Sequence, residues 1–280
     1  RPLPPRRPRP RRGPRLSLRN SSAWNPAVAA AGLAVLALVT LAAASAWPDD
    51  SPLVPREGGH PEGDESWAWL YLGAAVGAFA AYLAGLVLIA RGARVVPVAA
   101  LALAIQLAPL GAPLLLSTDA WTYWSYGRIA TVHDGNPYED EPAEFPQDAA
   151  FPYVGTDWHE ATSVYGPAFT LASEPVARAA GESEDAAAWI YKTLAALAVC
   201  AAAAIAARLA TRRSFAWAFV GWNPLLALHF AGGGHNDAWM AALVVGALAL
   251  AAAGRRELAG AAWALAIAVK WVPLVLLPLR

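Results

Sequence analysis

Long runs of Ala, Leu and Val alternate with short polar segments along most of the chain. Most runs are close to the roughly 20 residues that a helix needs to cross about 30 Å of hydrocarbon. Runs of this length predict transmembrane helices, at residues 26–47, 67–90, 95–116, 189–210, 214–231, 238–253 and 258–279. The expected fold is therefore all-α, a polytopic transmembrane helix bundle that resides in the plasma (inner) membrane.

The composition supports a membrane protein. Hydrophobic residues make up 57% of the chain and charged residues 15%, whereas a soluble domain carries about 45–50% apolar and about 25% charged residues. The single cysteine, Cys200, lies among alanines. A disulfide within the chain and a zinc site built on cysteines are therefore excluded.

The charges are segregated along the chain, and they predict its topology. Residues 1–25 are Arg/Pro-rich, with eight arginines and no acid in residues 1–19. Such a tail before an apolar span is typical of a cytoplasmic topogenic signal with a minor contact to anionic lipid, so no nucleic-acid partner is expected. With the tail inside, Glu257 is the only one of the 21 acids on the inner side. The loop at 117–188 is then extracytoplasmic.

Residues 26–280 are predicted to form one transmembrane catalytic domain. The chain has no initiator Met and stops just after an apolar span, so we expect further membrane helices beyond residue 280. The segment 117–163 is rich in aromatic and acidic residues, and a loop of that length is usually functional or disordered. The aromatic residues argue against disorder. Residues 164–180 are amphipathic and predict an interfacial helix that begins at Pro167.

Asp119 begins the long loop, where the third predicted span leaves the bilayer. A carboxylate near low dielectric has the raised basicity that suits a general base. The alternative is that Ser117, Thr118 or Asp119 caps the next helix, while the aromatic residues after it form an interfacial belt. Farther along the loop, Asn136-Pro137 predicts a turn, and Tyr138 beyond it is placed to stack on a sugar ring.

Three glycines precede His235, Asn236 and Asp237 between two apolar runs. They permit a tight turn or a close backbone approach to a phosphate. Asn236 and Asp237 suit a helix N-cap, but capping does not explain His235. A histidine beside a helix N-terminus can donate a hydrogen bond to a phosphate.

The two lysines both fall in or at apolar spans. Lys192 begins the fourth span, where snorkelling of the ammonium to the interface is the simplest explanation. Lys270 lies within the last span, so it should face a cavity and pair with an anion. With Arg128 and His235 they predict an outer-leaflet pocket for a phosphate-bearing, lipid-linked sugar donor and a hydroxyl acceptor.

On these residues the sequence resembles the polyprenol-phosphate-mannose-dependent α-1,6-mannosyltransferases of actinobacteria, multi-pass enzymes of the glycosyltransferase C superfamily. The resemblance covers roughly residues 95–280. It rests on the stretches Asp119-x-x-x-Tyr123-x-x-Tyr126-Gly127, Asn136-Pro137-Tyr138, Tyr165-Gly166-Pro167, Trp222-Asn223-Pro224, Ala268-Val269-Lys270 and, most specifically, Gly-Gly-Gly-His235-Asn236-Asp237.

The resemblance implies an inverting transfer of mannose from polyprenyl phosphate to a glycan or glycolipid, with Asp119 as the base that deprotonates the acceptor hydroxyl. No metal and no cofactor are expected. The superfamily's catalytic loop usually follows the first transmembrane helix, whereas here it follows the third predicted span. The residues expected to bind substrate are Tyr123, Tyr126, Arg128, Asn136, Tyr138, Tyr165, Lys192, His235, Asn236, Asp237 and Lys270.

Three alternatives stay open from the sequence. The same fold can use another lipid-linked sugar, arabinofuranose or glucose. A lipid-linked glycan transporter needs polar residues at both leaflets, but here the polar intramembrane features lie on one side. A purely structural subunit leaves the placement of His235 and Lys270 unexplained.

Overall fold

The computed structural model describes residues 25–55 and 63–279. Within these ranges the chain forms helices and no strands, which confirms the all-α prediction. The predicted cytoplasmic tail falls, except for Asn25, outside the described residues and stays a prediction. The main helices are α1 (Pro26–Ala44), α2 (Glu65–Ala90), α3 (Val95–Leu107), α4 (Asp119–Val132), α5 (Pro167–Ala180), α6 (Glu184–Leu209), α7 (Arg213–Gly221), α8 (Asp237–Ala252) and α9 (Arg256–Val269).

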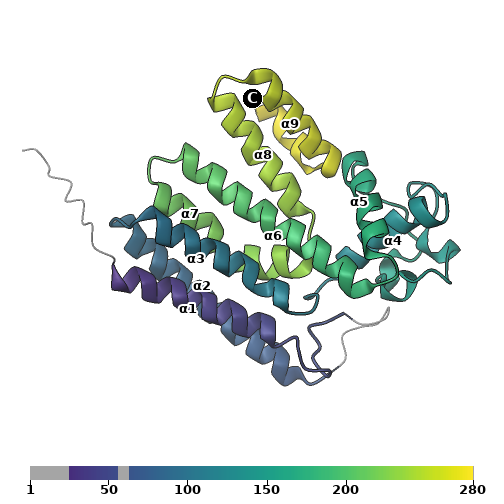
Figure 1. The fold of residues 1–280 in the computed structure, drawn as a ribbon, viewed down its shortest axis with the longest axis horizontal. Helices are drawn as coiled ribbons and strands as arrows, with labels where there is room; N and C mark the ends of the chain where they lie inside the picture. The colour runs from purple at the N-terminus through teal and green to yellow at the C-terminus, as the bar shows by residue number, and fades with distance from the viewer. Residues whose placement is uncertain (1–24, 56–62, 280) are drawn as a thin grey trace, which may run out of the picture.

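Long apolar helices form the body of the molecule, and the loop region lies at one end of it (Figure 1). α1, α2 and α6, of 19, 26 and 26 residues, are long and apolar enough to cross a membrane. The stretch Val95–Gly111, which is α3 with the 3₁₀ turn η1 (Ala108–Gly111), and α8 are apolar but shorter. α4 and α5 lie beyond the ends of the long helices, together with the short 3₁₀ helices η2 (Pro142–Glu144), η3 (Phe151–Tyr153) and η4 (Thr156–Trp158).

Three of the predicted spans are not continuous α-helices, and a proline lies at each interruption. α3 ends at Leu107, just before Pro109. α7 ends at Gly221, since Pro224 has no N–H to continue the ladder, and the chain resumes as the π-helix η5 (Leu226–Ala231). α9 ends at Val269, and the 3₁₀ helix η6 (Val272–Leu279), which contains Pro273, follows. The predicted spans over 95–116, 214–231 and 258–279 therefore each contain a break in the α-helix.

Trp222, the residue after α7, packs against α1, α2 and α3. Its ring is fully buried, and a Cβ atom at Gly32 of α1 or Gly85 of α2 would lie only 2.7 or 3.0 Å from it. Its indole N–H donates to the carbonyl of Val98 in α3, 3.0 Å away. The Trp-Asn-Pro motif therefore joins three helices and is part of the core.

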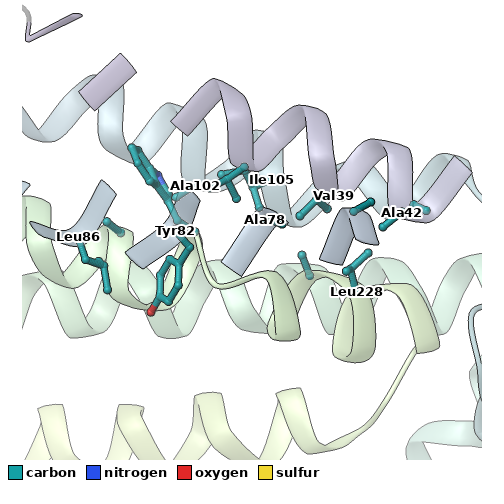
Figure 2. Packing of buried hydrophobic residues seen from close by; sticks show 14 of the residues in the cluster. Val39, Ala42, Ala78, Tyr82, Leu86, Ala102, Ile105 and Leu228 are labelled. Atoms are coloured by element: carbon teal, nitrogen blue, oxygen red, sulfur yellow. The ribbon is translucent and has the colours of Figure 1, made fainter. Parts of the chain in front are cut away.

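Small side chains let the first three helices approach closely. Figure 2 shows Ala42 of α1, Ala78 of α2 and Ala102 of α3 within one buried cluster. The same cluster satisfies backbone groups that α7 leaves free at its end. The Tyr82 hydroxyl donates to the carbonyl of Phe219 at 2.8 Å. Such bonds matter because lipid offers no partner to an unpaired carbonyl.

The interfacial helix predicted to begin at Pro167 is α5, and it begins there. The N–H of Gly166 donates to the carbonyl of Val269 at 3.1 Å, which joins α5 to the end of α9. A Cβ atom at Gly166 would overlap the carbonyl oxygen of Ala268. Glycine is therefore required for this approach, which fixes the position of the neighbouring Lys270.

An aromatic cluster holds α4 in place over the remaining helices. The ring of Tyr123 lies 4.8 Å from that of Phe169 in α5 and 5.3 Å from that of Tyr191 in α6. Phe169 in turn contacts Trp239 of α8, with ring centroids 5.2 Å apart. Edge-to-face contacts of this kind are directional, so they fix the orientation of α4 as well as its position.

Candidate functional site

Asp119 is the first residue of α4, and its carboxylate contacts two side chains. The hydroxyl of Tyr123, one helical turn later, donates to Oδ2 at 3.1 Å. Nδ1 of His235 lies 3.0 Å from the same oxygen. The side chain remains 25% exposed, so a substrate hydroxyl can reach it. Ser117, one of the residues in the capping alternative, also contacts Asp119. Its hydroxyl accepts a hydrogen bond from the backbone N–H of Asp119 at 3.1 Å.

The surroundings of Asp119 keep it ionised. Burial raises the pKa of this carboxyl, but the hydrogen bond and positive charge of His235 and the hydrogen bond from Tyr123 outweigh burial and leave the pKa below its ordinary value. Burial and the neighbouring Asp119 raise the pKa of Tyr123 well above its usual range. The phenol therefore stays protonated and donates to the carboxylate.

His235 is held by the turn between η5 and α8. Its backbone N–H donates to the carbonyl of Phe230 at 3.1 Å, and its ring lies 4.2 Å from the ring of His229. Its side chain is 7% exposed, and within the described part of the chain Nε2 has no hydrogen-bond partner. The ring thus presents one nitrogen to Asp119 and keeps the other free.

Asn236 and Asp237 follow, and the structure separates their roles. Asn236 occupies the N-cap position of α8, but its side chain makes no capping bond, and neither amide atom has a partner among residues 25–55 and 63–279. Asp237 pairs with Lys270, whose Nζ lies 2.7 Å from Oδ2, and both side chains are 29% exposed. This confirms that Lys270 pairs with an anion.

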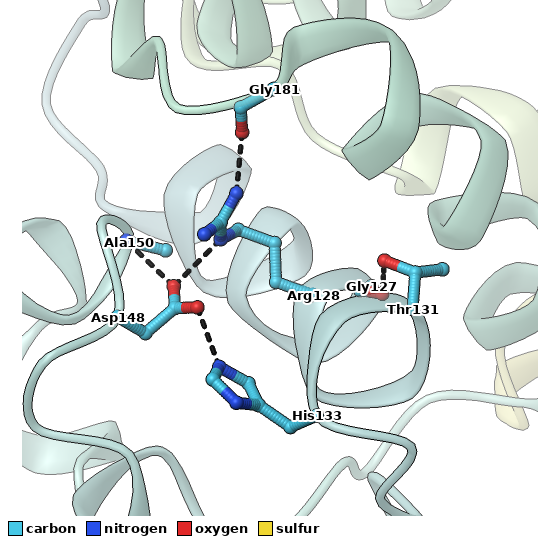
Figure 3. Close-up of polar contacts among 7 residues, drawn as sticks. All are labelled: Gly127, Arg128, Thr131, His133, Asp148, Ala150 and Gly181. Carbon is cyan, nitrogen blue, oxygen red and sulfur yellow. Dashed lines mark hydrogen bonds and ion pairs between the residues drawn. The ribbon is translucent and has the colours of Figure 1, made fainter.

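Arg128 has a carboxylate partner away from Asp119. Its Nε donates to Asp148 at 2.7 Å and its Nη1 to the carbonyl of Gly181 at 2.6 Å. Oδ2 of Asp148 also lies 2.7 Å from Nε2 of His133 (Figure 3). This buried network ties the end of α4 to the loop and to the end of α5. The structure does not bring Arg128 together with Asp119.

Asp148 was not singled out from the sequence. Charge-assisted hydrogen bonds and the backbone N–H of Ala150, at 2.8 Å, lower its pKa, although burial acts in the opposite sense. A buried arginine requires a nearby acid. However, the loop contains many acids, and nothing in their spacing selects this one.

The tyrosines and Asn136 of the long loop order its backbone. The hydroxyl of Tyr126 donates to the carbonyl of Ala161 at 2.8 Å. The hydroxyl of Tyr138 donates to the carbonyl of Tyr165 at 3.0 Å. The predicted turn at Asn136 is confirmed, because its carbonyl accepts from the N–H groups at 139 and 140, each at 2.8 Å.

Tyr165 lies against the ring of Tyr123, with centroids 4.9 Å apart, next to the carboxylate site. Burial and the charge of Asp119 raise the pKa of Tyr165 above its ordinary value. Tyr165 and Tyr123 are therefore the predicted substrate-binding tyrosines that the fold places nearest Asp119, whereas Tyr126 and Tyr138 face the loop backbone.

Lys192 does not snorkel to the interface, so that interpretation was wrong. The residue is 1% exposed, and its ammonium donates to the carbonyls of Ala112 and Pro113. It lines a cavity of about 520 Å³ beside the start of α6. Among the residues that the structure describes, no group of three His, Cys, Asp or Glu side chains is placed to hold a metal ion.

The fold and the site together define a helical membrane protein that holds an ionised carboxylate at the end of its apolar helices. The chain belongs to the α-(1→6)-mannopyranosyltransferase family: the model of the family described as "Alpha-(1->6)-mannopyranosyltransferase, N-terminal domain" matches residues 26–280.

Two curated relatives carry the same description. The chain is 33% identical over 177 residues to the α-(1→6)-mannopyranosyltransferase A of Mycobacterium tuberculosis, covering 60% of this chain and 34% of the relative. It is 27% identical over 169 residues to that of Corynebacterium glutamicum, covering 59% of this chain and 34% of the relative. The alignments thus span about a third of the relatives' length. No solved structure matches the chain.

Proposed function

We propose that this chain transfers mannose from a polyprenyl-phosphate donor to a hydroxyl of a glycan or glycolipid, with formation of an α-1,6 linkage. Membership of the family supports the sugar and the linkage. The observation that carries the proposal is the geometry at Asp119. An ionised, partly exposed carboxylate lies within hydrogen-bond distance of Tyr123 and His235 at the end of a helical bundle.

In the proposed reaction Asp119 is the general base. The acceptor hydroxyl gives its proton to Asp119 while its oxygen attacks the anomeric carbon of mannose. The bond between that carbon and the phosphate oxygen breaks, and its electron pair leaves with the polyprenyl phosphate. Attack from the face opposite the leaving group inverts the configuration, so a β-linked donor gives an α-mannoside.

The pKa of Asp119 is lowered, contrary to the raised basicity expected from its place in the sequence. The carboxylate is already ionised when the acceptor arrives, and it takes the proton as the hydroxyl becomes acidic in the transition state. His235 and Tyr123 both contact Oδ2 of Asp119. These two residues are positioning residues, since they fix the direction of the carboxylate.

The proposal places the site on the extracytoplasmic side of the membrane. The distribution of arginines along the sequence supports this orientation, because basic residues concentrate in the segments assigned to the inner side. Lipid-linked donors are available there, whereas soluble nucleotide sugars are cytoplasmic. The bilayer itself is then a partner of the apolar helices.

The test is a transfer assay on membranes that contain the full chain, with polyprenyl-phosphate mannose and the arabinose analogue offered in parallel. We expect mannose transfer, and a loss of about 10²–10⁴-fold in kcat for Asp119→Asn at unchanged membrane insertion. Asp134→Asn, another loop acid with no ion pair among the described residues, is the control and should retain activity. Preference for the arabinose analogue would show that arabinose, and not mannose, is the donor sugar. Full activity of Asp119→Asn would exclude Asp119 as the general base.

A further inference from the structure

The cations expected to bind phosphate differ in their partners. Arg128 pairs with Asp148, Lys270 with Asp237, and His235 with Asp119. Lys192 forms no ion pair with any carboxylate of the described ranges. Its charge is therefore the one in this set that no acidic side chain neutralises.

The ammonium of Lys192 is buried and keeps hydrogen-bonding capacity. It donates to two carbonyl oxygens, those of Ala112 and Pro113, and a lysine ammonium has three donors. Burying a charge without a counter-charge costs several kcal/mol in a low-dielectric region. A ligand with negative charge would offset that cost and take the remaining donor.

The cavity beside Lys192 suits a lipid headgroup. It measures about 520 Å³ and is lined by Trp47 beyond the end of α1, by the segment after α3 and by the start of α6. Trp47 and Trp189, both more than half exposed, line it. Tryptophan is typical of the membrane–water interface, where one side of a site is apolar and the other wet. Asp185 lies at its exposed rim, in the first turn of α6.

The cavity is close to the Asp119 site but separate from it. Gly234 lies between them: a Cβ atom there would be 3.2 Å from the Cβ of Ala120 and 3.4 Å from the backbone nitrogen of Lys192. The same turn therefore contacts α4 next to Asp119 and α6 at Lys192.

We infer that this cavity binds the phosphate of the lipid-linked donor and that Lys192 is its anchor. The inference rests on the proposed function, since it assigns the donor site of the same reaction. It also assigns different work to the other cations: Arg128 holds the loop, Lys270 holds α8 against the end of α9, and His235 holds Asp119.

The binding test uses farnesyl phosphate, with farnesol and inorganic phosphate as comparison ligands, and follows the thermal unfolding of the full chain in detergent. We expect farnesyl phosphate alone to raise the unfolding midpoint of the wild type. Lys192→Met should abolish the rise. Because that change also removes two hydrogen bonds to the backbone, a second variant is needed.

Gly111→Leu is that variant. Gly111 lines the cavity, and a Cβ atom there meets nothing within 4 Å, so a larger side chain can be introduced at the cavity wall. The matched control is Gly73→Leu on α2, which also meets nothing within 4 Å and does not line the cavity. The rise should disappear in Gly111→Leu and persist in Gly73→Leu. An equal rise in Gly111→Leu, or an equal response to farnesol or inorganic phosphate, would overturn the inference.

Kinetics separate this inference from the proposed function. Lys192→Met and Gly111→Leu should raise KM for polyprenyl-phosphate mannose, by about 10- to 100-fold for the lysine change, with a smaller effect on kcat. Asp119→Asn should lose transfer but still respond to farnesyl phosphate. A wild type that binds farnesyl phosphate but transfers no mannose would contradict the proposed function. It would not contradict the role of Lys192 in binding phosphate. Transfer with an unchanged KM in both cavity variants would contradict the anchor alone.

Discussion

The Nδ1 atom of His235 lies 3.0 Å from Oδ2 of Asp119, although 116 positions separate the two residues in the sequence. Asp119 begins α4, and His235 lies in the turn before α8. The contact exists because the aromatic cluster around Tyr123 packs α4 against α5 and α6, while Phe169 of α5 contacts Trp239 of α8. The electrostatic state of the carboxylate therefore depends on the packing of helices that are distant in sequence.

Replacing His235 should change the pH dependence of transfer. Activity needs ionised Asp119, so it is lost as pH falls through the pKa of this carboxyl. His235 lowers that pKa by its hydrogen bond and charge, so His235→Phe should raise it. The acid limb of the kcat/KM profile should then move to higher pH, which a pH series of the transfer assay measures.

Tyr123→Phe is the comparison for the histidine change. It removes one hydrogen bond to Asp119 and no positive charge, so the acid limb should move in the same direction by less. If His235→Phe keeps its activity and its acid limb lies at the same pH as in the wild type, the histidine does not control the ionisation of Asp119.

Asp148→Asn should destabilise the loop end of the molecule. Asp148 is 7% exposed in its side chain and pairs with Arg128 and His133. Removing one partner of a buried pair costs roughly 3–5 kcal/mol of unfolding free energy. Denaturant unfolding in detergent, followed by tryptophan fluorescence, measures the difference.

The stabilising effect of the Arg128–Asp148 pair should depend on pH. The pKa of Asp148 is depressed in the folded chain, so its contribution is present above the unfolded value of 3.8 and is lost as pH falls through the folded value. The gap between wild type and Asp148→Asn should therefore narrow below about pH 4. Glu174→Gln, in the exposed pair with Arg178, should cost only about 0–1 kcal/mol. Equal costs for both variants would contradict the structural role of Asp148.

Gly166→Ala should separate the start of α5 from the end of α9. The new Cβ would overlap the carbonyl oxygen of Ala268, so the backbone must shift and the bond from Gly166 to Val269 is strained. We expect a clear loss of stability, of about 1–3 kcal/mol, and a weaker Lys270–Asp237 pair. Thermal unfolding measures the first effect.

The control for Gly166 lies on α9 itself. A Cβ at Gly260 meets nothing within 4 Å, and alanine is favoured over glycine in a helix by about 1 kcal/mol. Gly260→Ala should therefore leave the chain as stable as the wild type or more so. If both substitutions are tolerated equally, the close approach of α5 to α9 is not required.

Local patterns in the sequence were sufficient for several elements. Apolar runs predicted the long helices α1, α2 and α6, because each run alone must satisfy its backbone in lipid. Pro167 predicted the start of α5, and Asn136-Pro137 predicted a turn, since both signals act within a few residues. The pairing of Lys270 with an anion followed from the cost of an unpaired charge.

Other features required the tertiary structure. Trp222 belongs to a motif that carries the family resemblance, and its ring fills the space between α1, α2 and α3. Arg128 was expected at phosphate, but it pairs with Asp148. In both cases the residue type limits what partner is needed, and only the packed helices determine which residue is close enough to be it.

The sequence by itself determined that the chain is apolar and helical and which residues carry charge within it. The tertiary structure alone decided that Arg128, His235 and Lys270 each pair with a carboxylate, and that Lys192, beside a cavity, forms no ion pair with a carboxylate of the described residues. The physical reason is that the two kinds of interaction differ in how far apart along the chain their partners lie. Hydrophobicity and backbone propensity act over a few residues along the chain, whereas an ion pair depends on distances of about 3–4 Å between side chains that the fold brings together.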